Sequence, residues 1–468
     1  MLEAGARIHL IGIAGSGLSA IARVLNERGF QVSGSDRAWS PLVQELLEEG
    51  IQVTVGHQPE NVLGAQLVIR SSAIAEDNIE LQTAQAAAIP ILKRVEFLPY
   101  LIGDQKAIAI AGTHGKTTTT AMTAWVLSSL GLDPSYVIGG ISLDLQRNAH
   151  AGRGSYFVIE ADEYDGMFLG LNPQYAIVTN IEYDHPDCYP TPRQFQAAFE
   201  QFVSQIQPGG ALITCVEDEG VQRLLRHLED PPTWFGYALK SSPAASLATY
   251  LADAIAKNPA GGYSFQANWQ GQLLALVDLP IPGIHNVQNA LAVVALSHQL
   301  GLSLDDVAQA LGRFHGTARR FQIRGTSQGV TVIDDYAHHP SEIKATLSAA
   351  RDRFPNHFLW AVWQPHTYSR TLTLWDGFCT AFHDADAVIV LDVYGAREQP
   401  PQGFSMAKLA AEIRSERKFF IPQLEAAEQF LLENLAPNQV VVILSAGDAD
   451  QLSRRLLTSL EQLREDVA

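Results

Sequence analysis

Short apolar runs alternate with segments of helical periodicity through most of the 468 residues. The run 107–110 predicts a buried strand, and it is followed by a glycine loop and then by residues 121–130, whose apolar positions recur at helical spacing. The same strand–loop–helix order begins near residue 7 and again near residue 330. Repeated βα units favour an α/β fold built on mostly parallel sheets.

The length is too great for one ordinary hydrophobic core, so we expect several domains. The pattern predicts a Rossmann-like domain over residues 1–104, a central domain over 105–316 and a second Rossmann-like domain over 317–468. Residues 190–282 are predicted as helices with short strands and loops. Three α/β domains are therefore the expected architecture.

The loop at 111–120 has the sequence Ala-Gly-Thr-His-Gly-Lys-Thr-Thr-Thr-Thr. Backbone N–H groups of such a loop and the positive end of the next helix bind phosphate, Lys116 adds a charge, and Thr117 can reach Mg²⁺. The spacing departs from the common P-loop, because only two residues separate Gly112 from Gly115. The alternative is a glycine turn that merely joins the strand to the helix. Threonine is a mediocre helix former, so four threonines at a helix start indicate that their hydroxyls have a function. We therefore expect a P-loop-type sheet that binds ATP or GTP.

Polar residues at two strand ends of the central block predict a metal site. The sequence Glu-Ala-Asp-Glu-Tyr-Asp at 160–165 follows a buried strand and places four carboxylates within six residues. A phosphate loop needs an acid from a neighbouring strand to complete a Mg²⁺ site, and Glu160 directly follows the apolar run. His185 follows the next strand at the same edge, so we expect it at the metal or the phosphate. A solvated acidic loop and a structural histidine are the alternatives.

The first block carries a glycine loop at 12–17 directly after its first predicted strand. Asp36 follows about 20 residues later, close to the dinucleotide-binding fingerprint, although Ala14 occupies the position of the middle glycine. A packing turn without a ligand is the alternative to a bound nucleotide or nucleotide-sugar, which we favour. Ser71 and Ser72 follow a further strand, where open sheets bind ligands but where hydroxyls are also common in ordinary turns.

Asn286 lies at the start of a predicted helix that ends before Gly301, and spacing alone favours a capping role for it. Arg319 and Arg320 are adjacent cations in a predicted linker. Ser341 is expected to cap the first helix of the last block. Polar residues also follow the predicted strands of that block: Asp335, Tyr336, His338 and Arg370.

Composition narrows the range of partners. The net charge of −18, without a basic stripe, argues against nucleic acid. No apolar run approaches the ~20 residues of a membrane span, and the N-terminus lacks a signal-peptide pattern. Three scattered cysteines, Cys188, Cys215 and Cys379, fit ordinary thiols in a reducing compartment. We expect a cytoplasmic protein with small-molecule partners, as a monomer or weak homodimer.

Taken together, the motifs resemble those of the Mur ligase family over nearly the whole chain. They are Gly-Thr-His-Gly-Lys-Thr-Thr at 112–118, Glu-Ala-Asp-Glu at 160–163, Asn-Ile-Glu at 180–182 with Asp184-His185, His285-Asn286 with Asn289, Gly316-Thr317 with 319–321, Asp-Asp-Tyr at 334–336 with His-His-Pro at 338–340, and Gln-Pro-His at 364–366. The resemblance implies ATP- and Mg²⁺-dependent amide formation in peptidoglycan synthesis. The lactyl carboxylate of UDP-N-acetylmuramate would attack the γ-phosphate, and the amine of L-alanine would displace phosphate from the acyl phosphate.

The resemblance also implies roles for the matched residues. Lys116, Glu160, His185 and Arg320 would carry catalysis. Thr117 and Glu160 would ligate Mg²⁺, and His185 would hold a second metal or the acyl phosphate. The implied ATP-binding residues are Gly112, Thr113, His114, Gly115, Lys116, Thr117, Thr118, Asn286, Asn289, Arg320 and Asp335. Those implied for the UDP substrate are Gly15, Ser16, Gly17, Asp36, Ser71, Ser72, Arg94 and His114. Those implied for the amino acid are Tyr336, His338 and Arg370. The nucleotide role of Asn286 replaces the capping role that spacing favours.

Two positions depart from the family pattern. Ala14 stands where members often have glycine, and Thr367 stands where many have arginine, which leaves Arg370 as the nearby cation for the alanine carboxylate. Other ligases of the superfamily remain alternatives: the enzyme that adds D-glutamate, the one that recycles cell-wall tripeptide, and folylpolyglutamate synthase. An ATP-driven switch protein without ligase activity is a further alternative. The nucleotide-sugar loop together with His-His-Pro favours L-alanine as the amino acid.

Overall fold

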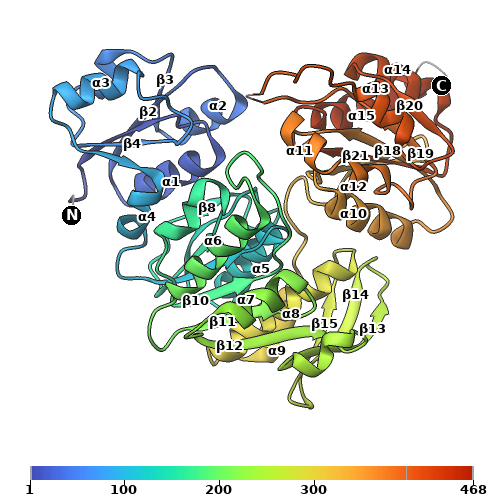
Figure 1. The fold of residues 1–468 in the computed structure, drawn as a ribbon, viewed down its shortest axis with the longest axis horizontal. Coiled ribbons are helices and arrows are strands. Elements are labelled where there is room, and N and C mark those ends of the chain that lie inside the picture. The colour runs from blue at the N-terminus through green and yellow to red at the C-terminus, as the bar shows by residue number, and fades with distance from the viewer. Residues whose placement is uncertain (1–2, 397, 466–468) are drawn as a thin grey trace.

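Three β-sheets, each flanked by helices, follow one another along the chain in the computed structural model, which describes residues 3–396 and 398–465. Figure 1 shows the N-terminal sheet at the upper left, the C-terminal sheet at the upper right and the central sheet below them. The predicted α/β architecture with three domains is confirmed. No helix in the described part of the chain is long and apolar enough to cross a membrane.

The first sheet is parallel throughout, with the strand order β3-β2-β1-β4-β5. Its strands are β1 (Arg7–Ile11), β2 (Gln31–Asp36), β3 (Gln52–Val55), β4 (Leu67–Arg70) and β5 (Ile91–Lys93). Its helices are α1 (Ser16–Glu27), α2 (Pro41–Glu48), α3 (Ile79–Ala86) and α4 (Arg94–Ile102). The strand order reverses between β1 and β4, so the loops after these two strands flank the crevice where open α/β sheets bind ligands.

The central sheet has ten strands in the order β15-β14-β13-β12-β11-β10-β6-β9-β7-β8. The strands are β6 (Lys106–Ala111), β7 (Ser135–Val137), β8 (Ala149–His150), β9 (Tyr156–Glu160), β10 (Tyr175–Val178), β11 (Ala211–Cys215), β12 (Thr233–Leu239), β13 (Tyr250–Lys257), β14 (Tyr263–Trp269) and β15 (Gln272–Leu279). The helices are α5 (Lys116–Ser129), α6 (Pro192–Ser204), α7 (Glu219–His227), α8 (Ile284–Gln299) and α9 (Leu304–Leu311).

The prediction for residues 190–282 is wrong over its second half. Strands β12 to β15 occupy most of residues 233–279, and β13, β14 and β15 form antiparallel pairs. Buried and exposed side chains alternate along β14 and β15, as expected for a sheet with one covered face. An alternation of apolar and polar positions with a period of two predicts strands, and the helical interpretation of this segment did not take it into account.

The third sheet has the order β16-β17-β21-β18-β19-β20 and is parallel except for β16. Its strands are β16 (Gln322–Ser327), β17 (Val330–Asp335), β18 (Phe358–Gln364), β19 (Ala387–Val390), β20 (Lys418–Phe420) and β21 (Gln439–Ser445). Its helices are α10 (Pro340–Arg353), α11 (Tyr368–Thr373), α12 (Trp375–Cys379), α13 (Met406–Glu412), α14 (Leu424–Asn434) and α15 (Asp450–Glu465).

Helix α10 begins at Pro340, two residues earlier than a Ser341 cap would place its start. His339 is the N-cap residue, and its ring accepts a 3.3 Å hydrogen bond from Ser341 N. Glu342 reaches back to accept from His339 N at 3.2 Å, which completes a capping box. The hydroxyl of Ser341 is instead directed at Glu182 of the central domain, 2.8 Å away.

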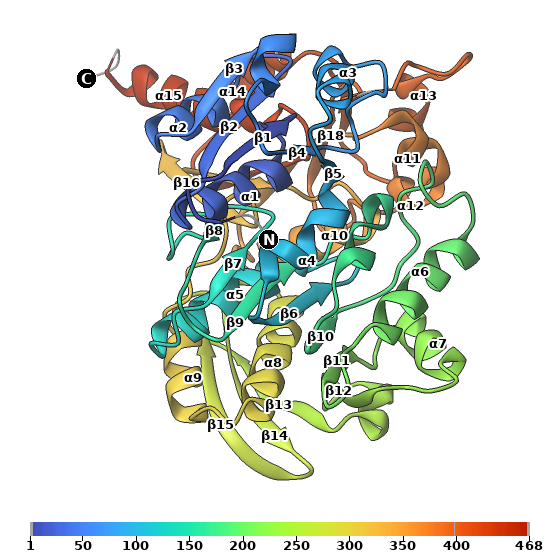
Figure 2. The ribbon, with the colours of Figure 1, turned by 90° about the vertical axis from the view of Figure 1, so that its left-hand side faces the viewer.

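The first two sheets share one hydrophobic core. Phe97 and Leu98 of α4 belong to the same buried cluster as Met167 and Phe168, which lie in the 3₁₀ segment Tyr164–Gly170. Figure 2 shows α4 between the first sheet and the strands of the central one. This packing fixes the first domain against the central domain next to the carboxyl end of β9.

Candidate active site

The phosphate loop connects β6 to α5, and its glycines are required by geometry. Gly112 and Gly115 have φ of +134° and +81°, and a Cβ at Gly112 would lie 2.0 Å from Thr179 Oγ1. Asn180 Oδ1 accepts a 2.8 Å hydrogen bond from His114 N, and the Thr113 hydroxyl donates to the Glu182 carbonyl at 2.8 Å. The loop is thus held against the end of the neighbouring strand with its remaining N–H groups at the start of α5.

Helix α5 starts at Lys116, five residues before the apolar periodicity that predicts it. The four threonines lie inside the helix and are buried, and the Thr120 hydroxyl donates to the Lys116 carbonyl at 2.8 Å. Back-bonding of this kind lets threonine occupy a helix despite its modest propensity. Thr117 and Thr118 consequently lie in the first turn, at the positive end of the helix dipole.

Lys116 is enclosed by oxygen acceptors. Its Nζ donates to the carbonyls of Gly112 and Thr113 at 2.6 and 3.1 Å and lies 2.8 Å from Glu163 Oε2. Burial alone lowers the pKa of Lys116, but Glu163 and Asp162 outweigh it and the net shift is upward. Burial raises the pKa of Glu163, but Lys116 and His185 together outweigh burial and the net shift is downward, so Glu163 and Lys116 are both charged.

Glu160 lies beside Thr117 at the end of β9. Its two carboxylate oxygens accept from Thr117 Oγ1 at 3.1 Å and from Gly139 N at 2.7 Å. Burial raises the pKa of Glu160, because the nearby Lys116 only partly offsets the loss of water. A hydroxyl and a buried carboxylate in contact are oxygen donors of the kind that Mg²⁺ selects, and a cation there would stabilise the charged carboxylate.

His185 lies at the same edge, as predicted from the strand order. Its Nε2 is 3.6 Å from Glu163 Oε1 and 3.8 Å from Asp184 Oδ2. Burial lowers the pKa of His185, but Glu163 and Asp184 raise it further and the net shift is upward. Glu163 therefore connects Lys116 and His185 within one buried charge network.

Arg320 approaches from the linker to the third sheet. Its guanidinium lies over the Tyr336 ring at 5.1 Å and 3.8 Å from Glu342 Oε1. Within the described residues its guanidinium makes no hydrogen bond, whereas the neighbouring Arg319 donates to the Ser445 carbonyl at 2.7 Å. Arg320 is consequently the cation whose donors remain available to a bound anion.

Arg370 is 5% exposed, and its donors are used within the protein. The guanidinium donates to Asp184 Oδ1 at 2.8 Å and to the His366 carbonyl at 2.9 Å. An amino-acid carboxylate would have to share Arg370 with Asp184, and the role of Arg370 as an amino-acid ligand stays a prediction.

His338 lies beside Tyr336, whose carbonyl is 3.0 Å from His338 Nδ1. Burial lowers the pKa of His338 to about 3, so this ring is neutral.

Two cavities meet at the phosphate loop. One, of about 650 Å³, is lined by residues that include His114, Thr118, Asn286, Asn289 and Asp335. The other, of about 500 Å³, is lined by residues that include Lys116, Glu160, His185, Tyr336, His338 and Arg370. Gly115, Thr117, Arg320 and Glu342 line both cavities. The arrangement offers a larger chamber for a nucleotide and a smaller one for reacting groups, joined where phosphates would lie.

Asn286 is not a helix cap, so the expectation from spacing is wrong. Gly283 is the N-cap of α8, and Asn286 Nδ2 donates to the Pro282 carbonyl at 2.7 Å. Asn289 Nδ2 donates in turn to Asn286 Oδ1 at 3.1 Å.

Asp335 lines the same cavity from the third domain. Burial raises the pKa of Asp335 to about 6, although its carboxylate accepts from Phe321 N at 2.7 Å.

Residues of the first domain divide into two groups. Ser16, Gly17 and Arg94 line the smaller cavity, with Arg94 Nη2 3.4 Å from Asp162 Oδ2. The remaining predicted residues lie at the strand ends of the first sheet and outside the lining of both cavities: Gly15, Asp36, Ser71 and Ser72. Asp36 Oδ2 accepts from Ala14 N at 2.9 Å, so the acid fixes the glycine loop of its own domain.

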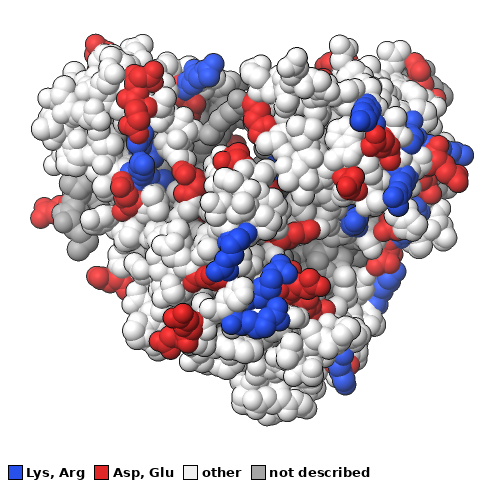
Figure 3. Space-filling view, viewed as in Figure 1, with Lys and Arg blue, Asp and Glu red and all other residues white. Residues whose placement is uncertain are grey.

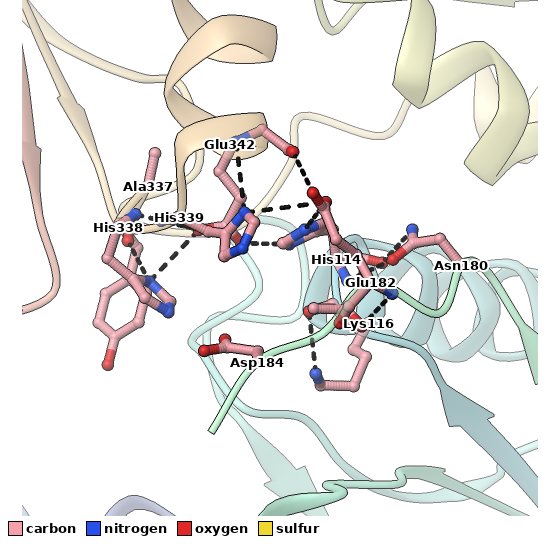
Figure 4. A network of polar contacts seen from close by, with 12 residues as sticks. His114, Lys116, Asn180, Glu182, Asp184, Ala337, His338, His339 and Glu342 are labelled. Atoms are coloured by element: carbon pink, nitrogen blue, oxygen red, sulfur yellow. Dashed lines mark hydrogen bonds and ion pairs between the residues drawn. The ribbon is translucent and has the colours of Figure 1, made fainter. Parts of the chain in front are cut away.

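The sequence analysis gave no individual role to Glu163, Glu182 and Glu342, although Glu163 and Glu182 belong to the motifs at 160–163 and 180–182. Glu182 Oε2 lies 2.9 Å from His114 Nε2, and Glu342 Oε1 lies 3.2 Å from His114 Nδ1. Figure 4 shows Glu342 and His339 beside His114, with Glu182 next to them. The capping-box spacing of His339 and Glu342 is the local signal that would have placed Glu342 at a helix start.

Family models match three consecutive parts of the chain. The Mur ligase family, catalytic domain matches residues 7–106, the Mur ligase middle domain residues 110–297, and the Mur ligase, glutamate ligase domain residues 319–447. The chain belongs to the Mur ligase family, as its motifs suggest.

Individual relatives narrow the comparison. The chain is 39% identical to the UDP-N-acetylmuramate–L-alanine ligase of Geobacter sulfurreducens over 98% of both chains, and 39% identical to that of Pelotomaculum thermopropionicum over 97% of this chain and 98% of the relative. The solved UDP-N-acetylmuramate-alanine ligase of Thermotoga maritima matches with a TM-score of 0.80 at 31% identity, covering 97% of this chain and 99% of that one. A murein peptide ligase from Psychrobacter arcticus matches with a TM-score of 0.72 at 25% identity, with the same coverage.

Proposed function

We propose that this chain joins L-alanine to the lactyl carboxylate of UDP-N-acetylmuramate at the expense of ATP. The products are UDP-N-acetylmuramoyl-L-alanine, ADP and phosphate, a step of peptidoglycan synthesis. Relatives named for this reaction match over nearly the full chain. The structural observation that carries the proposal is the junction of the two cavities at Gly115, Thr117 and Arg320.

ATP occupies the larger cavity in this proposal. Its adenine end lies toward Asn286 and Asn289, and its phosphates follow the loop N–H groups to the start of α5. Lys116 and Arg320 then flank the γ-phosphate from two sides. Bringing an anionic carboxylate to an anionic phosphate requires such neutralisation, which fixed cations in a water-poor site supply effectively.

The sugar-linked carboxylate reacts in the smaller cavity. A carboxylate is a poor acyl donor, because its leaving group would be oxide. Attack of one carboxylate oxygen on the γ-phosphorus forms an acyl phosphate and releases ADP. The alanine amine then adds to the carbonyl carbon, and loss of phosphate leaves the amide.

Thr117 and Glu160 are the proposed holders of Mg²⁺, and His185 is the proposed holder of a second metal or of the acyl phosphate. The Thr117 hydroxyl and the buried Glu160 carboxylate fit such an ion, as their 3.1 Å contact and the raised pKa of Glu160 indicate. The chemistry that Mg²⁺ would supply there is positive charge that neutralises the phosphate oxygens. Glu160 itself accepts from the Thr117 hydroxyl and so fixes its orientation, and Gly139 N fixes Glu160 in turn.

The amino acid is proposed to bind against the third sheet. His338 is neutral, and donation from its Nδ1 to the Tyr336 carbonyl leaves Nε2 as an acceptor for the alanine amine. Tyr336 and Arg370 line the same cavity. We assign residues 1–104 to the UDP substrate, 105–316 to ATP and 317–468 to the amino acid, and we place the enzyme in the cytoplasm, where ATP is available.

Phosphate release with defined amino acids tests the proposal. Purified protein with Mg-ATP and UDP-N-acetylmuramate is expected to release phosphate when L-alanine is added and to remain near background without it. D-Glutamate and the cell-wall tripeptide serve as matched alternatives. Release that requires D-glutamate, tripeptide or a folate contradicts the assignment. Release that is indifferent to every amino acid indicates an ATP-driven switch instead of a ligase.

A further inference from the structure

A cluster of His114, Glu182 and His339 bridges the central and third domains at the active site. His114 belongs to the phosphate loop, Glu182 follows β10, and His339 is the N-cap of α10 in the third domain. Figure 4 shows these side chains converging between the two domains. None of the three contacts Glu160, and Glu182 and His339 have no role in the proposed ligation.

The donor atoms of the cluster have the spacing of a metal site. One donor atom from each residue lies within 4.8 Å of the others. Glu182 Oε2 is 2.9 Å from His114 Nε2 and 3.7 Å from His339 Nδ1. Ligand atoms about 2.0–2.2 Å from a tetrahedral zinc ion lie roughly 3.3 Å apart, between these two distances. Small side-chain movements therefore suffice to bring the three donors around one ion.

The surrounding contacts are those that support metal ligands. The other nitrogen of His114, Nδ1, lies 3.2 Å from Glu342 Oε1. The other oxygen of Glu182, Oε1, accepts from the Ser341 hydroxyl at 2.8 Å. A metal-binding histidine characteristically donates its second N–H to a carboxylate, and ligating carboxylates are hydrogen-bonded in turn. Both arrangements are already present.

His339 provides an independent indication of a ligand. Its side chain is 2% exposed, and Nδ1, the nitrogen 3.7 Å from Glu182 Oε2, accepts only one long bond of 3.3 Å, from Ser341 N. The other nitrogen, Nε2, has no hydrogen-bond partner within the described residues. The ring centroids of His114 and His339 lie 4.8 Å apart. An ion pair between His114 and Glu182 does not by itself require the two rings to lie so close. Because Nδ1 accepts from Ser341 N, this nitrogen is unprotonated and is the atom of the ring that offers a lone pair.

We propose that His114, Glu182 and His339 bind a divalent transition-metal ion of the zinc class, with Glu342 and Ser341 orienting the ligands. Two imidazoles and one carboxylate suit zinc, whereas Mg²⁺ prefers the all-oxygen donors near Thr117 and Glu160. The ion takes the place of the proton between His114 and Glu182. Since the ligands come from both domains, the bound ion holds α10 against the phosphate loop.

Zinc titration of the full chain tests this site. The chelator-treated protein is titrated with ZnCl₂ by calorimetry in excess MgCl₂, which fills the oxygen-rich site first. We expect one zinc ion per chain, and at least about tenfold weaker binding in His339→Gln and in Glu182→Gln. Glu342→Gln, which removes an outer partner, is expected to weaken binding by about 10–100-fold. His315→Gln is the matched control, because His315 is an exposed histidine paired with Asp144.

Three results would overturn the site. They are the lack of stoichiometric zinc binding, equal affinity in the full chain and the cluster variants, and binding that Glu160→Gln removes while His339→Gln retains it. The first would leave the cluster as an ion-pair bridge alone. Circular dichroism checks that the variants fold. If a variant does not fold, the visible spectrum of the Co²⁺-loaded natural chain decides. Tetrahedral bands support the site, and an octahedral spectrum contradicts it.

Discussion

Lys116→Ala is expected to lower kcat by about 10³-fold or more. Lys116 is the buried cation of the phosphate loop, and it lies within hydrogen-bond distance of the Gly112 carbonyl and Glu163. A γ-phosphate at the loop would draw Nζ away from these acceptors as charge develops during transfer. Removing one such preorganised donor typically costs 10²–10³-fold, and a full charge at a phosphoryl group contributes more. Steady-state phosphate release measures the loss.

The variant also removes one of the two cationic partners of the buried Glu163 carboxylate and leaves it only His185, 3.6 Å away. Breaking a buried ion pair costs about 3–5 kcal/mol of stability. The double variant Lys116→Ala/Glu163→Gln removes that charge, so its folding separates stability from catalysis. Lys106→Ala is the matched control, because Lys106 is an exposed lysine at the opposite end of β6. A folded double variant that still ligates at the natural rate would contradict the phosphate-loop assignment.

Arg320→Ala is expected to lower kcat by on the order of 10³-fold while changing the KM for ATP much less. Arg320 lines both cavities and has no hydrogen bond from its guanidinium within the described residues. A cation that reaches the transferring phosphoryl group from a second element acts as an arginine finger does, chiefly on the transition state. Initial rates over a range of ATP concentrations separate the two effects.

Arg324→Ala provides the matched control for Arg320. Arg324 lies on β16 and donates to Gln322 Oε1 at 3.1 Å, outside the lining of both cavities. Arg320→Lys is expected to recover part of the rate, because a lysine restores charge but not the planar fork. An unchanged kcat with a raised KM for ATP would make Arg320 a ground-state binding residue only.

Local patterns were sufficient for most of the fold. Apolar runs such as β6 and β17 are buried on both faces of parallel sheets, so they stand out as strands. Strands β13 to β15 are half-exposed, and their alternation is weaker than an apolar run. The start of α5 was missed because buried threonines hide helical periodicity.

The site was only partly predictable, because many of its contacts join residues far apart in sequence. Glycine loops and strand-end acids indicated Lys116 and Glu160. Nothing local indicates that Arg370 contacts Asp184, 186 residues away, or that Glu342 contacts His114, 228 residues away. Such contacts depend on how the third domain packs on the central one. Acidic and basic side chains are interspersed on the face that Figure 3 shows, without a broad basic surface. Phosphate groups are therefore expected to be bound by individual cations and helix N-termini within the site.

Isotope transfer from the substrate carboxylate tests the proposed chemistry most directly. UDP-N-acetylmuramate carrying ¹⁸O in both lactyl carboxylate oxygens is incubated with the protein, Mg-ATP and L-alanine, and the released phosphate and ligated product are analysed by mass spectrometry. The acyl-phosphate pathway predicts one ¹⁸O in each phosphate released and one in the new amide carbonyl. Unlabelled phosphate, with alanine nevertheless ligated, would contradict transfer of the γ-phosphate to the carboxylate at this site.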